Sequence, residues 1–226
     1  RDLGDLTMDT NNRIRGNNFF YRGDYRQAIE AFTLVLRSEP GDAEIYVNRG
    51  AAHAALGEHA LAVADYDRAI ELEPDNAAAY NNRGLVHATL GDYRAALLDY
   101  ELAINLDPHD AVSYNNRGAA FEALGDVDSA LQDYGRAIEL DPQYAQAYYV
   151  RGSMHASQGN QELAIADYNE VISLIPRFAA AYYSRGLAHV EKAEMEQAIA
   201  DYTEAIEQSA QQLAGLYIRG LRIAER

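Results

Sequence analysis

The five prolines of this chain lie at a constant interval of 34 residues, at Pro40, Pro74, Pro108, Pro142 and Pro176. Seven glycines follow the same period: Gly16, Gly50, Gly84, Gly118, Gly152, Gly186 and Gly220. Self-similarity at a fixed period of this length is typical of repeat architectures, in which each unit packs on its neighbours. The spacing divides the chain into six units, 9–42, 43–76, 77–110, 111–144, 145–178 and 179–212, followed by residues 213–226.

Small and apolar residues recur at helical spacing inside each unit. In the second unit Tyr46, Gly50 and His53 lie on one helical face, and Ala62, Tyr66, Ala69 and Ile70 lie on another. Gly57 separates the two faces, and Pro74 stops the second helix. Residues that cap helices precede the following first helices, at Asp42, Asn76 and Asp110. Each unit is therefore expected to be a helix–turn–helix.

The pattern Y-x-x-R-G-x-x-H … A-x-x-x-Y-x-x-A … P in residues 46–74 resembles the tetratricopeptide repeat (TPR), in a variant similar to bacterial TPR arrays. The resemblance implies an all-α, right-handed α-solenoid of six repeats that forms a single domain over residues 1–226. Residues 213–226 would supply a capping helix for the sixth repeat. Two columns depart from the family pattern: Arg replaces Leu before the first glycine, and His replaces Tyr in four copies.

Composition excludes several classes of function. The 226 residues include 19 Lys and Arg against 35 Asp and Glu, and this formal net charge of −16 argues against binding nucleic acid. The chain has no cysteine, and no uninterrupted apolar stretch approaches the length of a membrane-spanning helix. It begins with Arg1 instead of Met, which indicates that the natural N-terminus is missing and leaves the compartment, including export or anchoring, open.

Two charged columns run through the repeats. The first helices carry Arg15, Arg49, Arg83, Arg117, Arg151, Arg185 and Arg219, and the second helices carry Asp65, Asp99, Asp133, Asp167 and Asp201. Each residue lies at the edge of the apolar face of its helix, so the columns predict a repeating, partly buried ion pair. Sequence does not decide whether each Arg meets the Asp of its own repeat or of the preceding one. A row of anion-binding arginines is the alternative, which the matched acids disfavour.

The recurring histidines are interpreted as structural. His53, His87, His155 and His189 belong to different repeats, and stacked helices would separate them by about 10 Å, too far to share a metal ion. We therefore expect no metal site and no cofactor. No grouped nucleophile, base and acid, and no phosphate-binding glycine loop, is visible, so the chain is not expected to be an enzyme.

The face of the first helices that points away from the core contains two notable groups. Asn48, Asn82 and Asn116 form one column, accompanied by Asn81 and Asn115, and resemble the asparagine ladder of the TPR superhelix in O-linked N-acetylglucosamine transferases. Asn can both donate and accept, so a column of them can hold the backbone of an extended peptide. Farther along, Tyr149, Tyr183 and Tyr217 are candidate anchors for apolar side chains. The alternatives are solvated asparagines, and tyrosines that shield the neighbouring helix.

A carboxylate clamp of the kind known in TPR co-chaperones is only partly matched. Arg13, Asn17 and Asn48 occupy clamp positions, but Ala78 and Asn82 stand where two further cations are expected. We therefore expect a non-enzymatic scaffold that binds a neutral or basic, extended segment of a partner protein in its concave groove. The alternative is a structural module that self-assembles through its ends or convex faces, giving a homo-oligomer. A recruiting domain of a larger protein is also open.

Overall fold

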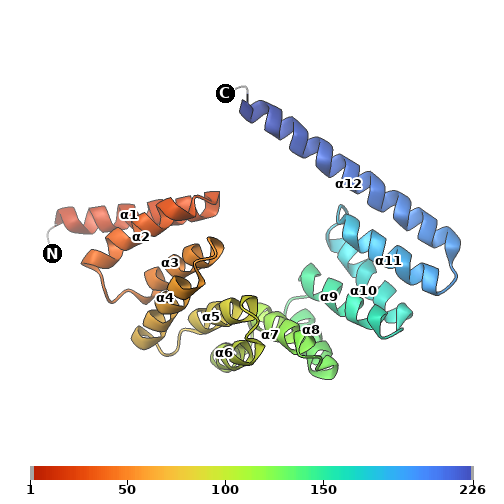
Figure 1. Cartoon of the computed structure of the whole chain (residues 1–226), viewed down its shortest axis with the longest axis horizontal. Helices are drawn as coiled ribbons and strands as arrows, with labels where there is room; N and C mark the ends of the chain where they lie inside the picture. Colours follow the sequence, from red (N-terminus) through yellow and green to blue (C-terminus); the bar gives the residue numbers. More distant parts are fainter. Residues whose placement is uncertain (1–2, 225–226) are drawn as a thin grey trace. The chain divides into compact units, whose positions relative to one another are not determined.

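The computed structural model describes the backbone of residues 3–224 and the side chains of residues 10–211, and this part of the chain is all α, without a strand (Figure 1). It forms an all-α solenoid of helix pairs. The chain divides into two compact units, Arg1–Asp126 and Val127–Arg226, and each is described by itself. That residues 1–226 form a single domain stays a prediction.

The helices follow the predicted repeat units closely. The first compact unit contains α1 (Leu3–Arg22), α2 (Tyr25–Ser38), α3 (Ala43–Ala55), α4 (His59–Leu72), α5 (Ala77–Thr89), α6 (Tyr93–Leu106) and α7 (Ala111–Ala123). The second contains α8 (Val127–Leu140), α9 (Ala145–Ser157), α10 (Gln161–Leu174), α11 (Ala179–Glu191) and α12 (Met195–Ala224). Neighbouring helices in each unit pack against one another in chain order, as expected for stacked helix pairs.

The predicted caps are confirmed. The Asp42 carboxylate accepts from the backbone N–H of Ile45 at 3.1 Å, and the Asn76 amide accepts from that of Ala79 at 3.0 Å. Asp110 caps α7 in the same way. The turns inside the repeats need a left-handed residue, which Gly57 supplies with φ +75°. In the sixth repeat a non-glycine residue, Ala193, adopts this conformation with φ +59°.

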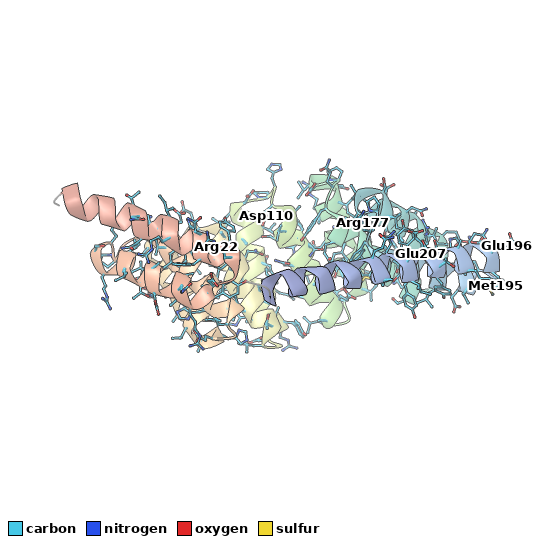
Figure 2. All side chains as sticks on the ribbon, turned by 90° about the horizontal axis from the view of Figure 1, so that it is seen from above. Arg22, Asp110, Arg177, Met195, Glu196 and Glu207 are labelled. Atoms are coloured by element: carbon cyan, nitrogen blue, oxygen red, sulfur yellow. The ribbon has the colours of Figure 1, made fainter. Side chains whose placement is uncertain are left out.

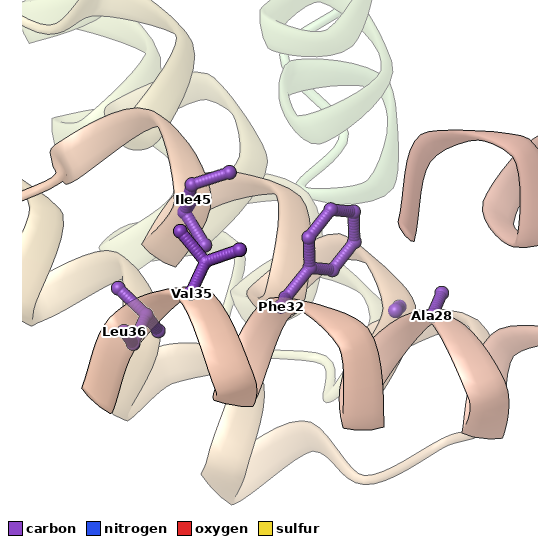
Figure 3. Packing of buried hydrophobic residues seen from close by; sticks show 6 residues of the cluster. Ala28, Phe32, Val35, Leu36 and Ile45 are labelled. Carbon is purple, nitrogen blue, oxygen red and sulfur yellow. The ribbon is translucent and has the colours of Figure 1, made fainter. Parts of the chain in front are cut away.

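The core lies between the two helices of each repeat and between successive repeats. In the first repeats Ala28, Phe32, Val35, Leu36 and Ile45 form a buried cluster (Figure 3). In the second, third and fifth repeats the tyrosine of the second helix is buried over a glycine of the first helix: a Cβ added at Gly50 would lie 2.8 Å from the ring of Tyr66. The recurring small residues thus let two helices approach closely.

The end of the sixth repeat differs from the expectation of a separate helix over residues 213–226. One helix, α12, runs from Met195 to Ala224 (Figure 1). The reason is local: Ala210 replaces the proline that stops the other second helices. None of the helices within residues 3–224 combines the length and apolar character that a bilayer span requires.

Candidate functional site

The Arg and Asp columns form bidentate ion pairs within the same repeat. In four repeats the Arg Nε donates to Asp Oδ2 at 2.9–3.0 Å and Nη2 donates to Oδ1 at 2.5–2.7 Å. These pairs are Arg49–Asp65, Arg83–Asp99, Arg151–Asp167 and Arg185–Asp201. Hydrogen bonding to the carboxylate raises the pKa of each of these arginines above its usual value. The ion-pair prediction is confirmed, and the own-repeat alternative is correct.

A second contact of three of these arginines joins adjacent repeats. The remaining nitrogen, Nη1, donates to a residue sixteen positions earlier, on the preceding second helix: Arg49 to Thr33, Arg83 to Asp67 and Arg185 to Asn169. The guanidinium also lies 5.5–5.8 Å from the ring centre of the tyrosine three residues before it. These arginines therefore have structural partners on every side, which disfavours anion binding.

The histidine column takes part in the same internal network. His53 Nδ1 lies 2.6 Å from Glu58 Oε2, and its Nε2 lies 3.9 Å from Asp65. His189 repeats this arrangement with Glu194 and Asp201. Among the described residues, no group of three or more His, Cys, Asp or Glu is placed to hold a metal ion. The geometry agrees with structural histidines.

In the first compact unit, asparagines of the first helices are half-buried, among them Asn48, Asn81, Asn82 and Asn116. Asn116 Nδ2 donates to Asn81 Oδ1 at 3.1 Å, which links the third and fourth repeats. Asn115 is only 8% exposed, and its Oδ1 accepts no hydrogen bond from the described residues. The side chains of Asn17, Asn48 and Asn82 are half-buried. Asn48 and Asn82 make no side-chain hydrogen bond within the described part of the chain, so their amide groups are available to a ligand.

In the second compact unit, the aromatic residues of the first helices are not equivalent. Tyr149 is half-buried, its ring centre lies 5.2 Å from that of Phe178, and its hydroxyl lies 3.3 Å from Ser184 Oγ. This contact joins neighbouring first helices in the same columns as Asn81 and Asn116. Tyr183 is 54% exposed and is the more accessible anchor. The side chain of Tyr217 lies outside the described residues.

The positive charge of Arg13, at the clamp position in the first repeat, is neutralised by nearby carboxylates. The guanidinium of Arg13 on α1 forms ion pairs with both Glu39 and Asp42, at the connection that leads to α3. An acidic peptide would have to compete with these two carboxylates. Sequence reasoning missed them because they lie in the next connection, outside the columns used to compare repeats.

Comparison with known proteins supports the repeat assignment along most of the chain. Profiles described as tetratricopeptide repeat match residues 15–72, 77–110, 111–144 and 179–212, and one described as TPR repeat matches residues 54–91 and 152–193. A crystal structure of MamA is similar with a TM-score of 0.68 and 27% identity, over 73% of this chain and 96% of that one. YrrB, titled a TPR protein with an unusual peptide-binding site, is similar with a TM-score of 0.64 and 26% identity. The alignment covers 85% of this chain and all of YrrB.

A protein from Parabacteroides merdae ATCC 43184, itself titled a tetratricopeptide repeat protein, has the same fold. It aligns with a TM-score of 0.70 at 21% identity, over 89% of this chain and 80% of its own. Sequence profiles, helix pairs and similar structures thus agree. The chain belongs to the tetratricopeptide-repeat family.

Proposed function

We propose that the protein binds an extended peptide segment of a partner along the first helices, with Asn48, Asn82 and Asn116 holding the peptide backbone. The observation that carries the proposal is the free hydrogen-bonding capacity of Asn48 and Asn82 on one face of successive repeats. An extended peptide presents N–H and C=O groups at regular intervals, and an amide side chain can pair with either. Four further residues would flank this row: Arg13, Asn17, Asn81 and Asn115.

Apolar positions beside the asparagines would receive the peptide's side chains. Leu85 on α5 and Val112 on α7 are both exposed, near Asn82 and Asn116 in the sequence of the same helices. In the second unit Tyr183 is the exposed aromatic anchor, with Tyr149 and Tyr217 as the other members of its column. Backbone contacts at the asparagines would supply affinity, and these side chains would supply selectivity.

The charge of the chain sets the class of peptide. A net charge of −16 repels acidic segments, and Arg13 is already paired with two carboxylates. A neutral or basic segment therefore fits better than an acidic tail. We also propose that the protein is a scaffold and not an enzyme, because its columns of Arg, Asp and His are engaged in contacts that hold repeats together.

The proposal is tested by selecting ligands from a random library of linear peptides displayed on phage, with the whole protein as bait. Selected peptides are expected to be neutral or basic, and binding of the basic ones should weaken as ionic strength rises. The matched control bait carries Asn105→Ala, because Asn105 is an exposed asparagine on α6, a second helix. Enrichment of acidic peptides, or of none above a bait-free control, would contradict the proposal.

A further inference from the structure

The last repeat encloses an open pocket that is separate from the asparagine row. It has a volume of about 1340 Å³ and lies between the α10–α11 connection, α11 and the middle of α12. Its lining is mostly apolar and aromatic, with Ile175, Phe178, Tyr183, Tyr202 and Ile206 as the large side chains. Arg177, labelled in Figure 2, is the charged residue among the described lining residues. This lining favours an occupant with an apolar face.

The preceding repeat shows what fills the equivalent place. There the rings of Tyr149 and Tyr168 pair with centres 5.9 Å apart, as those of Tyr183 and Tyr202 do at 5.7 Å. The first pair is closed at the start of α11, where the cap residue Phe178 packs on Tyr149, and Tyr168 is only 2% exposed. The second pair is open, with Tyr183 54% exposed. A helix that packs as α11 does would close it.

The same chain's end cannot turn into this pocket while α12 stays helical. Residues 208–211 of α12 form part of the pocket wall, and the helix continues from there to Ala224 (Figure 1). At about 1.5 Å per residue, the thirteen residues after Gln211 extend it by roughly 20 Å along its axis. A return to the pocket would require a break, and the proline that follows the other second helices is absent here.

The sequence of this extension combines an apolar face with positive charge. Leu213, Tyr217 and Ala224 follow Tyr202 and Ile206 at helical spacing, so the apolar face of α12 continues into it. Residues 213–226 contain Arg219, Arg222 and Arg226 against a single Glu225, in a chain of net charge −16. Glu204 and Glu207 lie on the α12 segment that forms the pocket wall; Figure 2 labels Glu207. The extension is thus a basic, amphipathic helix in an acidic protein.

We propose that the pocket of one protein molecule receives residues 213–224 of α12 from a second copy, and that the exchange is reciprocal. A two-fold axis makes both contacts identical, so two pockets and two extensions are used at once and the assembly closes as a dimer. The contact does not involve Asn48, Asn82 or Asn116. The dimer and the asparagine row can therefore fail separately, although Tyr183 and Tyr217 are shared with the aromatic part of the proposed peptide site.

The test is sedimentation velocity of the whole chain at concentrations up to about 100 μM, with two disabling variants. Ile206→Asp places a charge in the pocket, and Tyr217→Asp places one on the apolar face of the extension. The wild type is expected to dimerise, and each variant to raise the dimer dissociation constant at least tenfold. Leu163→Asp is the matched control, because Leu163 on α10 is similarly exposed but does not line the pocket.

A mixing experiment separates this contact from any other mode of association. The Ile206→Asp copy keeps its extension and the Tyr217→Asp copy keeps its pocket, so an equimolar mixture restores one of the two contacts. We expect the mixture to form a heterodimer that neither variant forms alone. Circular dichroism checks that both variants keep the wild-type helix content.

Three results would overturn the proposal. A wild type that stays monomeric over the whole concentration range would show that a second copy is not the occupant. If, in addition, Tyr217→Asp lowered the melting temperature of that monomer, the chain's own end would be the occupant. A dimer that survives both substitutions would place the interface elsewhere.

Discussion

At the scale of single residues, the column arginines fix how neighbouring helices pack against one another. Each places two nitrogens on a carboxylate that is nearly inaccessible to solvent: Asp99, for example, is 4% exposed. The third nitrogen of Arg83 reaches Asp67 on the preceding second helix. A leucine at this position, as in the general family pattern, would pack but could not fix the register of two neighbouring helices.

Removing one member of this pair is expected to be costly. Arg83→Met leaves Asp99 buried without its cation, and we expect the free energy of unfolding to fall by about 3 kcal/mol. Urea denaturation followed by circular dichroism measures the change. The double variant Arg83→Met, Asp99→Leu removes both charges, and its free energy of unfolding should fall clearly less than that of the single variant. Equal losses in the two variants would show that the ion pair is not the cause.

The stability of the fifth repeat is expected to depend on pH through His155. Burial lowers the pKa of His155, while Asp167 opposes this effect and Arg151 adds to it. Its Nδ1 has no hydrogen-bond partner among the described residues, and Asn160 stands where Glu58 and Glu194 accompany the other histidines. The folded state binds the proton of His155 less tightly than the unfolded state does. The contribution of neutral His155 to the free energy of unfolding is therefore complete above the unfolded-state pKa of about 6.5. It is lost as the pH falls below that value.

Phenylalanine is the natural replacement, since Phe121 occupies the same column in the fourth repeat. Between pH 7.5 and 5.5, the melting temperature of the His155→Phe variant should therefore fall by less than that of the wild type. Carboxylates that titrate in the same range are common to both proteins and cancel in the comparison. An equal fall in melting temperature in the two proteins over this range would rule out His155 as the titrating group.

At the scale of helices, two glycines in helix interiors are expected to behave oppositely. A Cβ on Gly84 would lie 2.8 Å from the Tyr100 ring, so Gly84→Ala should destabilise the protein by about 1–3 kcal/mol. A Cβ on Gly135 would have only Arg151 Nη1 nearby, at 3.8 Å. Gly135→Ala should therefore stabilise α8 by about 0.5–1 kcal/mol, the usual helix-propensity gain. Thermal unfolding distinguishes the signs, and the same sign for both would contradict the packing argument.

Periodicity predicts the helices well because each repeat carries its own start and stop signals. The caps at Asp42, Asn76 and Asp110 follow from residue type and spacing, and so does the existence of ion pairs between the Arg and Asp columns. Which Asp meets which Arg could not be derived, because a strict period places one candidate in each neighbouring repeat and only side-chain reach decides. The continuous α12 was not anticipated, although the missing proline at Ala210 was its signal.

The candidate site was harder to derive than the fold. Spacing located Asn48, Asn82 and Asn116 on one face, but it did not show that Asn116 is bonded to Asn81. Nor did it show that Tyr149 packs against Phe178, because such contacts depend on how far one repeat rotates relative to the next. Polar residues sixteen positions before Arg49, Arg83 and Arg185 were a readable sign of the inter-repeat bonds, and they were overlooked.

At the scale of the whole molecule, the chain is a protein-interaction scaffold of the tetratricopeptide-repeat family. Its charged columns are used internally, its net charge is strongly negative, and its free amide groups lie on the first helices. These features support the proposal of an extended neutral or basic ligand that is held by its backbone. Affinity should then depend on the asparagine row more than on any single apolar position.

The most direct test is the affinity of a selected peptide for the triple variant Asn48→Ala, Asn82→Ala, Asn116→Ala, measured by isothermal titration calorimetry. Each lost hydrogen bond is worth about 0.5–1.5 kcal/mol, so the triple variant should bind at least about tenfold more weakly. Asn105→Ala should bind as the wild type does, and Asn81→Ala controls for loss of the Asn81–Asn116 bond. A triple variant that folds normally and binds with unchanged affinity would contradict the account, because the asparagine row would then not hold the peptide.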